Sequence, residues 1–328
     1  MLLAAALIVR DEAAMLPACL ASLAGVVDEI QVYDTGSTDG TPELAAQLGA
    51  TVTRGGWEDD FSAARNAAAG GCSATWVLAL DADHRVTADP AALRRLLAGA
   101  TAKALRVTVD DAHHAGPYRQ LETRLYRPRA ASWSGRVHER LLRPAQATIP
   151  AYAIKLSHLG YATPADLHRR AERNLALARV ALGELAAHGP AADRRQIAQL
   201  MLHLGRDCAA ANRRQEAVDA FELLRELFPG TREWLQATDS LARLVLADGY
   251  DRVCLVLVDQ LRVAGAPTPY CDWLAAQAMA QLGFPHDAAA MLAGVTEVVD
   301  TAGRRRDPAA LRELTALIER LRVLAPAV

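Results

Sequence analysis

The hydrophobic pattern of this chain of 328 residues changes near residue 163, and this change constrains the fold more than any other feature of the sequence. Before it, short apolar runs alternate with segments of helical spacing, which is typical of parallel β-α-β units. After it, apolar residues recur almost only at helical spacing. The sequence therefore predicts an α/β domain over residues 1–163 and an all-α domain over residues 164–328.

The first half contains apolar runs that we expect to form the strands of a mixed sheet. Leu2–Val9 is continuously apolar, as expected of a strand that is buried on both faces of a parallel sheet. The other expected strands are Glu29–Tyr33, Ala50–Thr53, Trp76–Leu80, Leu105–Val109, Glu122–Arg127 and Ile149–His158. The expected helices are Glu12–Leu23, Pro42–Leu48, Ser62–Gly70 and Pro90–Leu97.

The second half contains a helical repeat that resembles the tetratricopeptide pattern. The best match to that pattern is Leu204, Gly205, Cys208, Ala217, Phe221 and Pro229. Weaker matches begin at Leu241 and Ala275, at offsets of 37 and 34 residues. The alternative is an ordinary alanine-rich helical bundle without a repeat.

The composition excludes several classes of protein. With 36 basic and 38 acidic residues, neither a basic nucleic-acid-binding domain nor an acidic tail is expected. No apolar run approaches the roughly 20 residues of a membrane span, and the apolar start lacks the basic residues of a signal peptide. The five cysteines are widely spread and form no Cys-x-x-Cys pair, so neither a zinc site nor a disulfide framework is expected, and a cytoplasmic location fits this chain.

Two acidic segments follow expected strands. Asp34 opens the segment Asp34–Thr41, and Asp81-Ala82-Asp83 follows a later strand. Ligands of open α/β sheets bind beyond the carboxyl ends of the strands, where Asp34 could accept hydrogen bonds from a nucleobase or a ribose. Asp81 and Asp83 would point to the same side of an extended chain, which suits Mg²⁺ or Mn²⁺ together with a substrate phosphate. The alternatives are a capped turn and a solvated loop.

A third segment, Trp57–Asn66, places acidic residues just before an expected helix. Asp60 would then compensate the dipole of that helix without any ligand. In the functional interpretation, Arg65 and Asn66 face a nucleotide or the Asp81–Asp83 loop.

Two further segments contain histidines and an acid. In Trp133–Glu139, His138 and Glu139 are adjacent, so on an extended chain they would point to opposite sides and would not form one dyad, although either could act as a base. In Ser157–Tyr161, His158 stands near the end of the α/β domain and is either structural or a ligand.

Taken together and in this order, these segments resemble glycosyltransferase family two, which has the GT-A fold, from Leu3 to about Tyr161. The resemblance is to a SunS-like branch, in which such domains often continue into helical repeats and some members modify peptides. It is carried by the DTGSTDGT run, Trp-x-x-Asp-Phe-x-x-Ala-Arg-Asn, Asp-Ala-Asp, Gly-x-Val-His-Glu and His-x-Gly-Tyr. His84 stands where this branch usually has Glu, which bears on the choice of metal and on the sugar contacts.

The resemblance implies a role for each residue that matches. Asp81 and Glu139 would be catalytic, with Glu139 as the candidate base. Asp83 and His158 would hold a divalent metal, Mn²⁺ or Mg²⁺. The residues that would bind the nucleotide-sugar are Val9, Arg10, Glu12, Asp34, Gly36, Arg65, Asn66, Asp81, Ala82 and Asp83.

The sequence therefore predicts an inverting, metal-dependent glycosyltransferase that moves a sugar from a UDP-linked donor to a peptide, a protein or another acceptor. The helical half would hold the acceptor or form a homodimer. The alternative is a non-catalytic tetratricopeptide-type adaptor with a vestigial sugar-nucleotide-binding domain. A nucleotidyltransferase is disfavoured, because Arg10–Ala14 contains none of the glycines that such enzymes commonly carry after the first strand.

Overall fold

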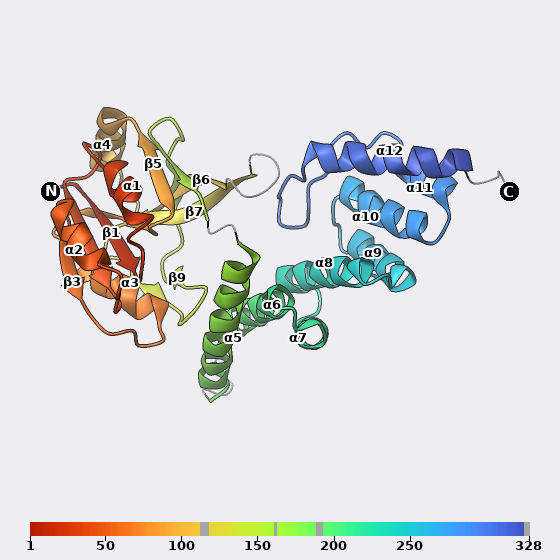
Figure 1. The fold of residues 1–328 in the computed structure, drawn as a ribbon, viewed down its shortest axis with the longest axis horizontal. Helices are drawn as coiled ribbons and strands as arrows, with labels where there is room; N and C mark the ends of the chain where they lie inside the picture. The colour runs from red at the N-terminus through yellow and green to blue at the C-terminus, as the bar shows by residue number, and fades with distance from the viewer. Residues whose placement is uncertain (112–117, 161–162, 188–192, 325–328) are drawn as a thin grey trace. The chain divides into compact units, whose positions relative to one another are not determined.

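The computed structural model describes residues 1–111, 118–160, 163–187 and 193–324, and these form two compact units that divide between residues 160 and 163 (Figure 1). The first unit is α/β. In the described part of the second unit, eight helices are accompanied by one isolated β-bridge, between Val299 and Arg305. The predicted order, an α/β domain followed by a helical one, is confirmed.

The elements of the first unit are, in chain order, β1 (Leu3–Val9), α1 (Leu16–Ala21), β2 (Glu29–Asp34), α2 (Thr41–Gln47), β3 (Thr51–Arg54), α3 (Phe61–Gly70), β4 (Trp76–Leu80), β5 (His84–Ala88), α4 (Pro90–Gly99), β6 (Ala104–Asp111), β7 (Tyr118–Tyr126), β8 (Trp133–Ser134), β9 (Arg140–Leu141), β10 (Ala147–Thr148) and β11 (Ile154–His158). The helices of the second unit are α5 (Pro164–Ala187), α6 (Arg194–Ala210), α7 (Arg214–Leu227), α8 (Arg232–Ala247), α9 (Asp251–Val263), α10 (Thr268–Gln281), α11 (Pro285–Leu292) and α12 (Pro308–Leu324). None of the described helices is long and apolar enough to cross a membrane.

Nine strands of the described chain form one mixed sheet. Its order is β3-β2-β1-β4-β7-β6-β11-β5, and β10 pairs with β6. Strands β3, β2, β1 and β4 run parallel, whereas β7 runs antiparallel to both of its neighbours and β5 runs antiparallel to β11. The expected mixed sheet is confirmed.

The continuous apolar run of β1 is explained by burial on both faces of the sheet. Successive side chains of a strand point to opposite faces. Leu3 and Leu7 pack with side chains of α1 and α4 in one apolar cluster, while Ala4 and Ala6 pack with side chains of α3 in a second cluster. Both faces of β1 are therefore covered, and β1 lies in the interior of the unit.

Helix α1 is shorter than the predicted helix over Glu12–Leu23. It begins only at Leu16. The backbone before it is bound by a distant segment, because the Glu12 N–H donates to Thr41 Oγ1 over 2.8 Å. A contact between segments 29 residues apart thus overrides the local helical periodicity.

Strand β5 has no counterpart among the predicted strands. It is short and mostly polar, so it carries no apolar run that would have marked it. Its place in the sheet comes from antiparallel pairing with β11, in which His158 lies opposite His84. Strand β11 begins at Ile154 instead of the predicted Ile149.

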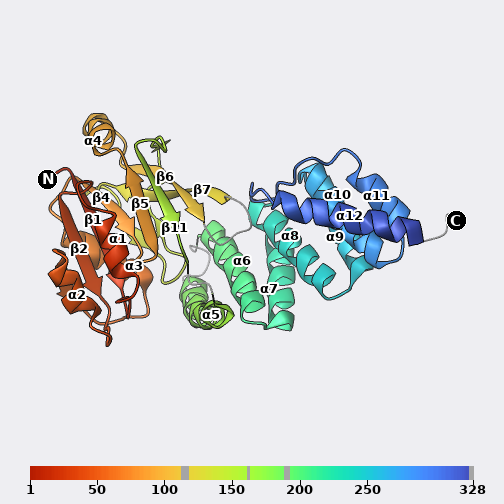
Figure 2. The same ribbon diagram turned by 45° about the horizontal axis from the view of Figure 1, so that its top comes forward.

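The helical unit follows the predicted repeat at its best match. Helices α6 to α11 follow one another through short connections, as Figure 2 shows. Phe221 on α7 is buried to 1% exposure and packs against Gly205 on α6. A Cβ atom at Gly205 would lie only 2.5 Å from Phe221 Cε1. The glycine of the repeat pattern is therefore required by the close approach of the Phe221 ring.

We predict that Gly205→Ala lowers the free energy of unfolding of the helical unit by about 1–3 kcal/mol, because the added methyl group overpacks the contact with Phe221. Gly183→Ala is the matched control, since Gly183 also lies in a helix but its added Cβ would meet no atom within 4 Å. This control is expected to be neutral or to stabilise by up to about 1 kcal/mol. Thermal unfolding of the full chain measures both variants, and equal stability of Gly205→Ala and wild type would contradict the packing.

Candidate active site

Several charged side chains meet near the carboxyl end of β4. This is the edge at which open α/β sheets bind their ligands. We call these residues the strand-end cluster; they are Arg65, Asp81, Asp83, His84, Arg124, Glu139 and His158. The structure thus brings together five residues that the sequence singled out and His84, which the sequence flagged as a departure, and it adds Arg124.

Arg65 joins the two residues that the sequence predicts to be catalytic. Its Nη2 donates to Asp81 Oδ1 over 2.8 Å, and its Nε donates to Glu139 Oε1 over 2.5 Å. The side chain of Arg65 is only 8% exposed, and its guanidinium lies 5.2 Å from the centre of the Trp133 ring. One buried cation therefore holds two carboxylates that come from distant parts of the chain.

Arg124 of β7 is a second cation at Asp81, and the sequence analysis missed it. Its Nη1 donates to Asp81 Oδ2 over 3.2 Å, and its Nε donates to Glu122 Oε2 over 2.8 Å. Burial alone would raise the pKa of Asp81, but the charges of Arg65 and Arg124 outweigh it and hold that pKa well below its usual range. Both oxygens of Asp81 are thus engaged by arginines.

Asp83 differs from Asp81 because one of its oxygens carries no hydrogen bond, and the ring nitrogen Nδ1 of His84 lies 3.8 Å from that oxygen. Oδ1 is buried and has no hydrogen-bond partner, whereas Oδ2 lies 3.1 Å from His158 Nε2. Burial raises the pKa of Asp83, but the hydrogen bond from His158 and the charges nearby lower it overall, so the group is a carboxylate at neutral pH. A buried carboxylate oxygen without a partner is costly unless a cation binds it. The oxygen of Asp83 and the adjacent imidazole of His158 therefore fit a divalent metal.

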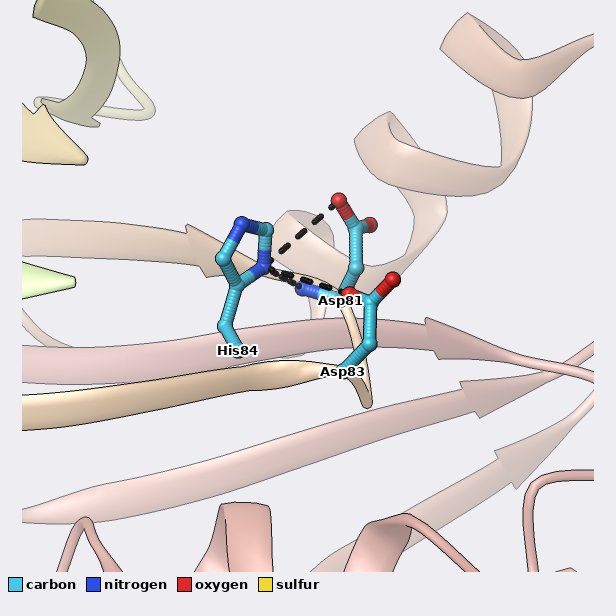
Figure 3. Close-up of side chains that lie close together, drawn as sticks. All are labelled: Asp81, Asp83 and His84. Atoms are coloured by element: carbon cyan, nitrogen blue, oxygen red, sulfur yellow. Dashed lines mark hydrogen bonds and ion pairs between the residues drawn. The ribbon is translucent and has the colours of Figure 1, made fainter. Parts of the chain in front are cut away.

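His84 completes a compact group with the two aspartates, which Figure 3 shows. One potential ligand atom from each of Asp81, Asp83 and His84 lies within 4.8 Å of the others. However, His84 Nδ1 already accepts the backbone N–H of Asp81 over 3.0 Å. Burial and the charge of Arg124 lower the pKa of His84 to about 4, so the ring is neutral at pH 7. His84 Nδ1 thus fixes the turn after β4. His158 Nε2 is likewise engaged, by Asp83 Oδ2, so Asp83 Oδ1 is the carboxylate oxygen here that carries no hydrogen bond.

The segment Asp34–Thr41 forms the capped turn that the sequence left open as an alternative, and it also binds a neighbouring loop. Asp34 is buried at the end of β2 and accepts the backbone N–H groups of Gly36 and Ser37. Further along, Asp39 accepts the N–H of Ala13 over 3.0 Å. Side chains of this segment therefore hold the loop after β1, and the capped-turn interpretation describes part of what the segment does.

The segment before and within α3 is also explained largely by local structure. Asp60 is the N-cap of α3, where its side chain accepts the N–H of Ala63 over 2.9 Å. The amide of Asn66 is directed at the backbone of Trp133, to which it donates over 3.0 Å and from which it accepts over 2.9 Å. Arg65 thus faces the strand-end cluster, whereas Asn66 holds β8 in place.

The remaining predicted site residues lie around the same edge of the sheet. Val9 is the buried end of β1, Arg10 is exposed in the loop that follows, and Ala82 is buried between the two aspartates. Glu139 stands between β8 and β9 directly after His138, which has a φ of 52°, so this stretch is a turn and not an extended strand. Tyr161, the last residue of the resemblance, lies outside the described residues.

Comparison with known proteins finds that most of the first unit is similar to one protein family. Residues 5–153 match the family model described as Glycosyl transferase family 2. A TPR repeat-containing protein of Synechococcus elongatus is 52% identical over 80 residues, which are 24% of this chain and 20% of that protein. An uncharacterized glycosyltransferase of Rickettsia felis is 34% identical over 85 residues, which are 26% of this chain and 30% of that protein. The chain thus spans less than a third of either curated relative.

Among solved structures, the chain is similar to the crystal structure of TarS residues 1–349 from S. aureus. The identity is 13%, the TM-score is 0.39, and the match covers 98% of this chain and 92% of that one.

We predict that Arg65→Gln lowers the free energy of unfolding of the first unit by about 3 kcal/mol at pH 7, because Glu139 loses its buried cation and Asp81 keeps only Arg124. The paired pKa of Asp81 lies below its ordinary value of 3.8, so its contribution to stability is complete above about pH 4 and is lost as the pH falls. The difference between wild type and variant should therefore shrink below pH 4. Denaturant unfolding at several pH values tests this.

The control is Arg54→Gln, which removes an exposed pair with Glu43. An exposed ion pair contributes at most about 1 kcal/mol, so this variant should unfold nearly as wild type does. A similar small effect at Arg65 would contradict the structural role of its two ion pairs.

Proposed function

We propose that this chain, whose residues 5–153 match the family model described as Glycosyl transferase family 2, transfers a sugar from a nucleotide-sugar donor to an acceptor with inversion. One observation carries the proposal: Asp83 presents a buried, unpartnered carboxylate oxygen beside His158, at the sheet edge where ligands of α/β domains bind. That donor set suits the divalent cation that would accompany a nucleoside diphosphate.

The two aspartates would take different roles. Asp83 and His158 would hold Mn²⁺ or Mg²⁺, which, when bound, would neutralise the negative charge of the diphosphate leaving group. Asp81 is engaged by Arg65 and Arg124 and would fix both arginines beside the donor. A hydrogen bond from one of its oxygens to a sugar or ribose hydroxyl remains compatible with this arrangement, because a carboxylate oxygen accepts more than one bond.

Glu139 is the proposed base. Among the described residues it is bound only by Arg65, through Oε1, so its other oxygen can accept a proton. In the proposed step, the acceptor hydroxyl attacks the anomeric carbon and passes its proton to Glu139 as the bond to the nucleoside diphosphate breaks. Attack opposite the leaving group inverts the anomeric centre.

The helical unit would bind the acceptor, a peptide, a protein or another molecule. Helical repeats stack into extended surfaces of the kind that hold such ligands. The packing of Gly205 against Phe221 supports a repeat of this type in the second unit.

We predict that Asp83→Asn abolishes the Mn²⁺-dependent thermal stabilisation by UDP and lowers sugar transfer at least about 100-fold, because it removes the anionic oxygen that the cation needs. A panel of nucleotide-sugars with Mn²⁺ or Mg²⁺, read as the shift in melting temperature, identifies the donor for this test. Glu43→Gln is the control, since Glu43 is exposed on α2 and its ion pair among the described residues is with exposed Arg54. Unchanged metal dependence in Asp83→Asn would refute the assignment.

We further predict that Glu139→Gln preserves donor binding and lowers turnover by about 10²–10⁴-fold, because the amide oxygen can still accept from Arg65 but cannot take up a proton. Isothermal calorimetry and product formation measure the two properties separately. Equal loss of binding and of turnover would assign Glu139 to donor binding instead. If the wild type neither transfers nor slowly hydrolyses any nucleotide-sugar with metal, the adaptor alternative holds.

A further inference from the structure

A second cluster of charged side chains lies wholly within the helical unit. It contains four arginines, and we call it the arginine cluster. Arg206 comes from α6, Arg243 comes from α8, and Arg304 and Arg306 come from the segment between α11 and α12. The last three side chains are each about a third exposed, at 31–32%, so an ion from solvent can reach them.

Two buried aspartates share this region, but their oxygens are already used. Asp239 accepts from Tyr270 Oη, Thr301 Oγ1 and Arg243 Nε. Asp300 accepts two backbone N–H groups of its own turn and the Nε of Arg304, each over 2.8–2.9 Å. The aspartates are 1% exposed and anchor the segment between α11 and α12. Arg243 and Arg304 therefore have a structural role, as the ion-pair partners of these two aspartates.

Arg206 and Arg306 do not form a close hydrogen-bonded ion pair of this kind. Among the described residues, Arg206 has one hydrogen bond, to Gln236 Oε1 over 3.2 Å, and no carboxylate partner. Arg306 has its Nε and Nη2 buried without hydrogen bonds, and its nearest carboxylate oxygen, on Asp300, lies 3.6 Å away. The four guanidiniums and two carboxylates leave a local charge of +2.

Arg206 remains a cation in these surroundings. Burial, followed by the charges of Arg304 and Arg243, lowers its pKa to about 10, which is still well above neutral pH. Like charges that are held together at this cost favour the binding of a compensating anion. The rings of Tyr270 and Trp273 lie 6.0 and 5.8 Å from the guanidinium of Arg306 and keep it in place.

We propose that the arginine cluster binds a phosphate dianion, either the free ion or a phosphomonoester group. A phosphate carries a charge of about −1.5 to −2 at pH 7 and three strong acceptor oxygens, which matches the excess of two positive charges and the three partly exposed arginine side chains of the cluster. A carboxylate would neutralise only half of that excess. Planar guanidinium groups bind such oxyanions in pairs of parallel hydrogen bonds.

The test is calorimetric titration of the full chain with inorganic phosphate in low salt, without metal, nucleotide or acceptor. Wild type is compared with Arg206→Gln, Arg306→Gln and the control Arg252→Gln, whose side chain is exposed on α9. The two cluster variants should each weaken phosphate binding at least about tenfold, and the control should bind as wild type does. Because no donor is present, the result does not depend on the proposed transferase activity.

Two further titrations distinguish the source of the anion. Glycerol 3-phosphate that binds about as tightly as inorganic phosphate supports a phosphomonoester as the ligand, whereas binding of inorganic phosphate alone supports the free ion. Sulfate should compete with either, and acetate at the same concentration should bind much more weakly. Circular dichroism shows whether each variant is folded. The proposal is overturned if wild type binds no phosphate, or if both folded cluster variants bind it as tightly as wild type.

Discussion

The buried guanidinium of Arg65 is the interaction on which the strand-end cluster depends. Without it, Glu139 in the β8–β9 turn would have no cation among the described residues, and Asp81 at the end of β4 would keep only Arg124. Helix α3 supplies the Arg65 cation, and its position is fixed by the Asp60 cap and by the packing of Arg65 on Trp133. The local structure of one helix thus determines where two carboxylates from distant segments can meet.

The surroundings of the two aspartates, more than their identity, distinguish one from the other. Asp81 and Asp83 are two residues apart, yet one is saturated by arginines and the other keeps an oxygen without a partner. Differences of this kind are how a protein assigns different chemistry to identical groups. The arginine cluster of the helical unit is a similar case with opposite charge. Asp239 and Asp300 neutralise two of its four cations, and the other two charges are not balanced by these aspartates.

Much of this molecule could be predicted from its sequence, because long apolar runs and ordered motifs carry strong signals. The order of an α/β unit followed by a helical unit is confirmed, and strand Trp76–Leu80 was predicted to the residue. Strand β5 could not be found, since it is polar and owes its place to pairing with β11. Arg124 was missed for a related reason: nothing in the sequence near β7 reveals that this side chain crosses to Asp81, because sheet order brings β7 beside β4.

The side-chain amide of Asn66 forms hydrogen bonds with both the backbone N–H and the backbone carbonyl of Trp133, as a neighbouring strand would. The short β8–β9 hairpin is therefore fastened to α3 at its first residue and paired to itself at Ser134 and Arg140. Between these anchor points, the carbonyl of Arg136 accepts the N–H of Phe61 over 2.9 Å, so the turn that carries Glu139 is also tied to the start of α3. The carboxylate of Glu139 thus takes its position from α3, and a change in the packing of α3 would move this group without altering the register of the main sheet.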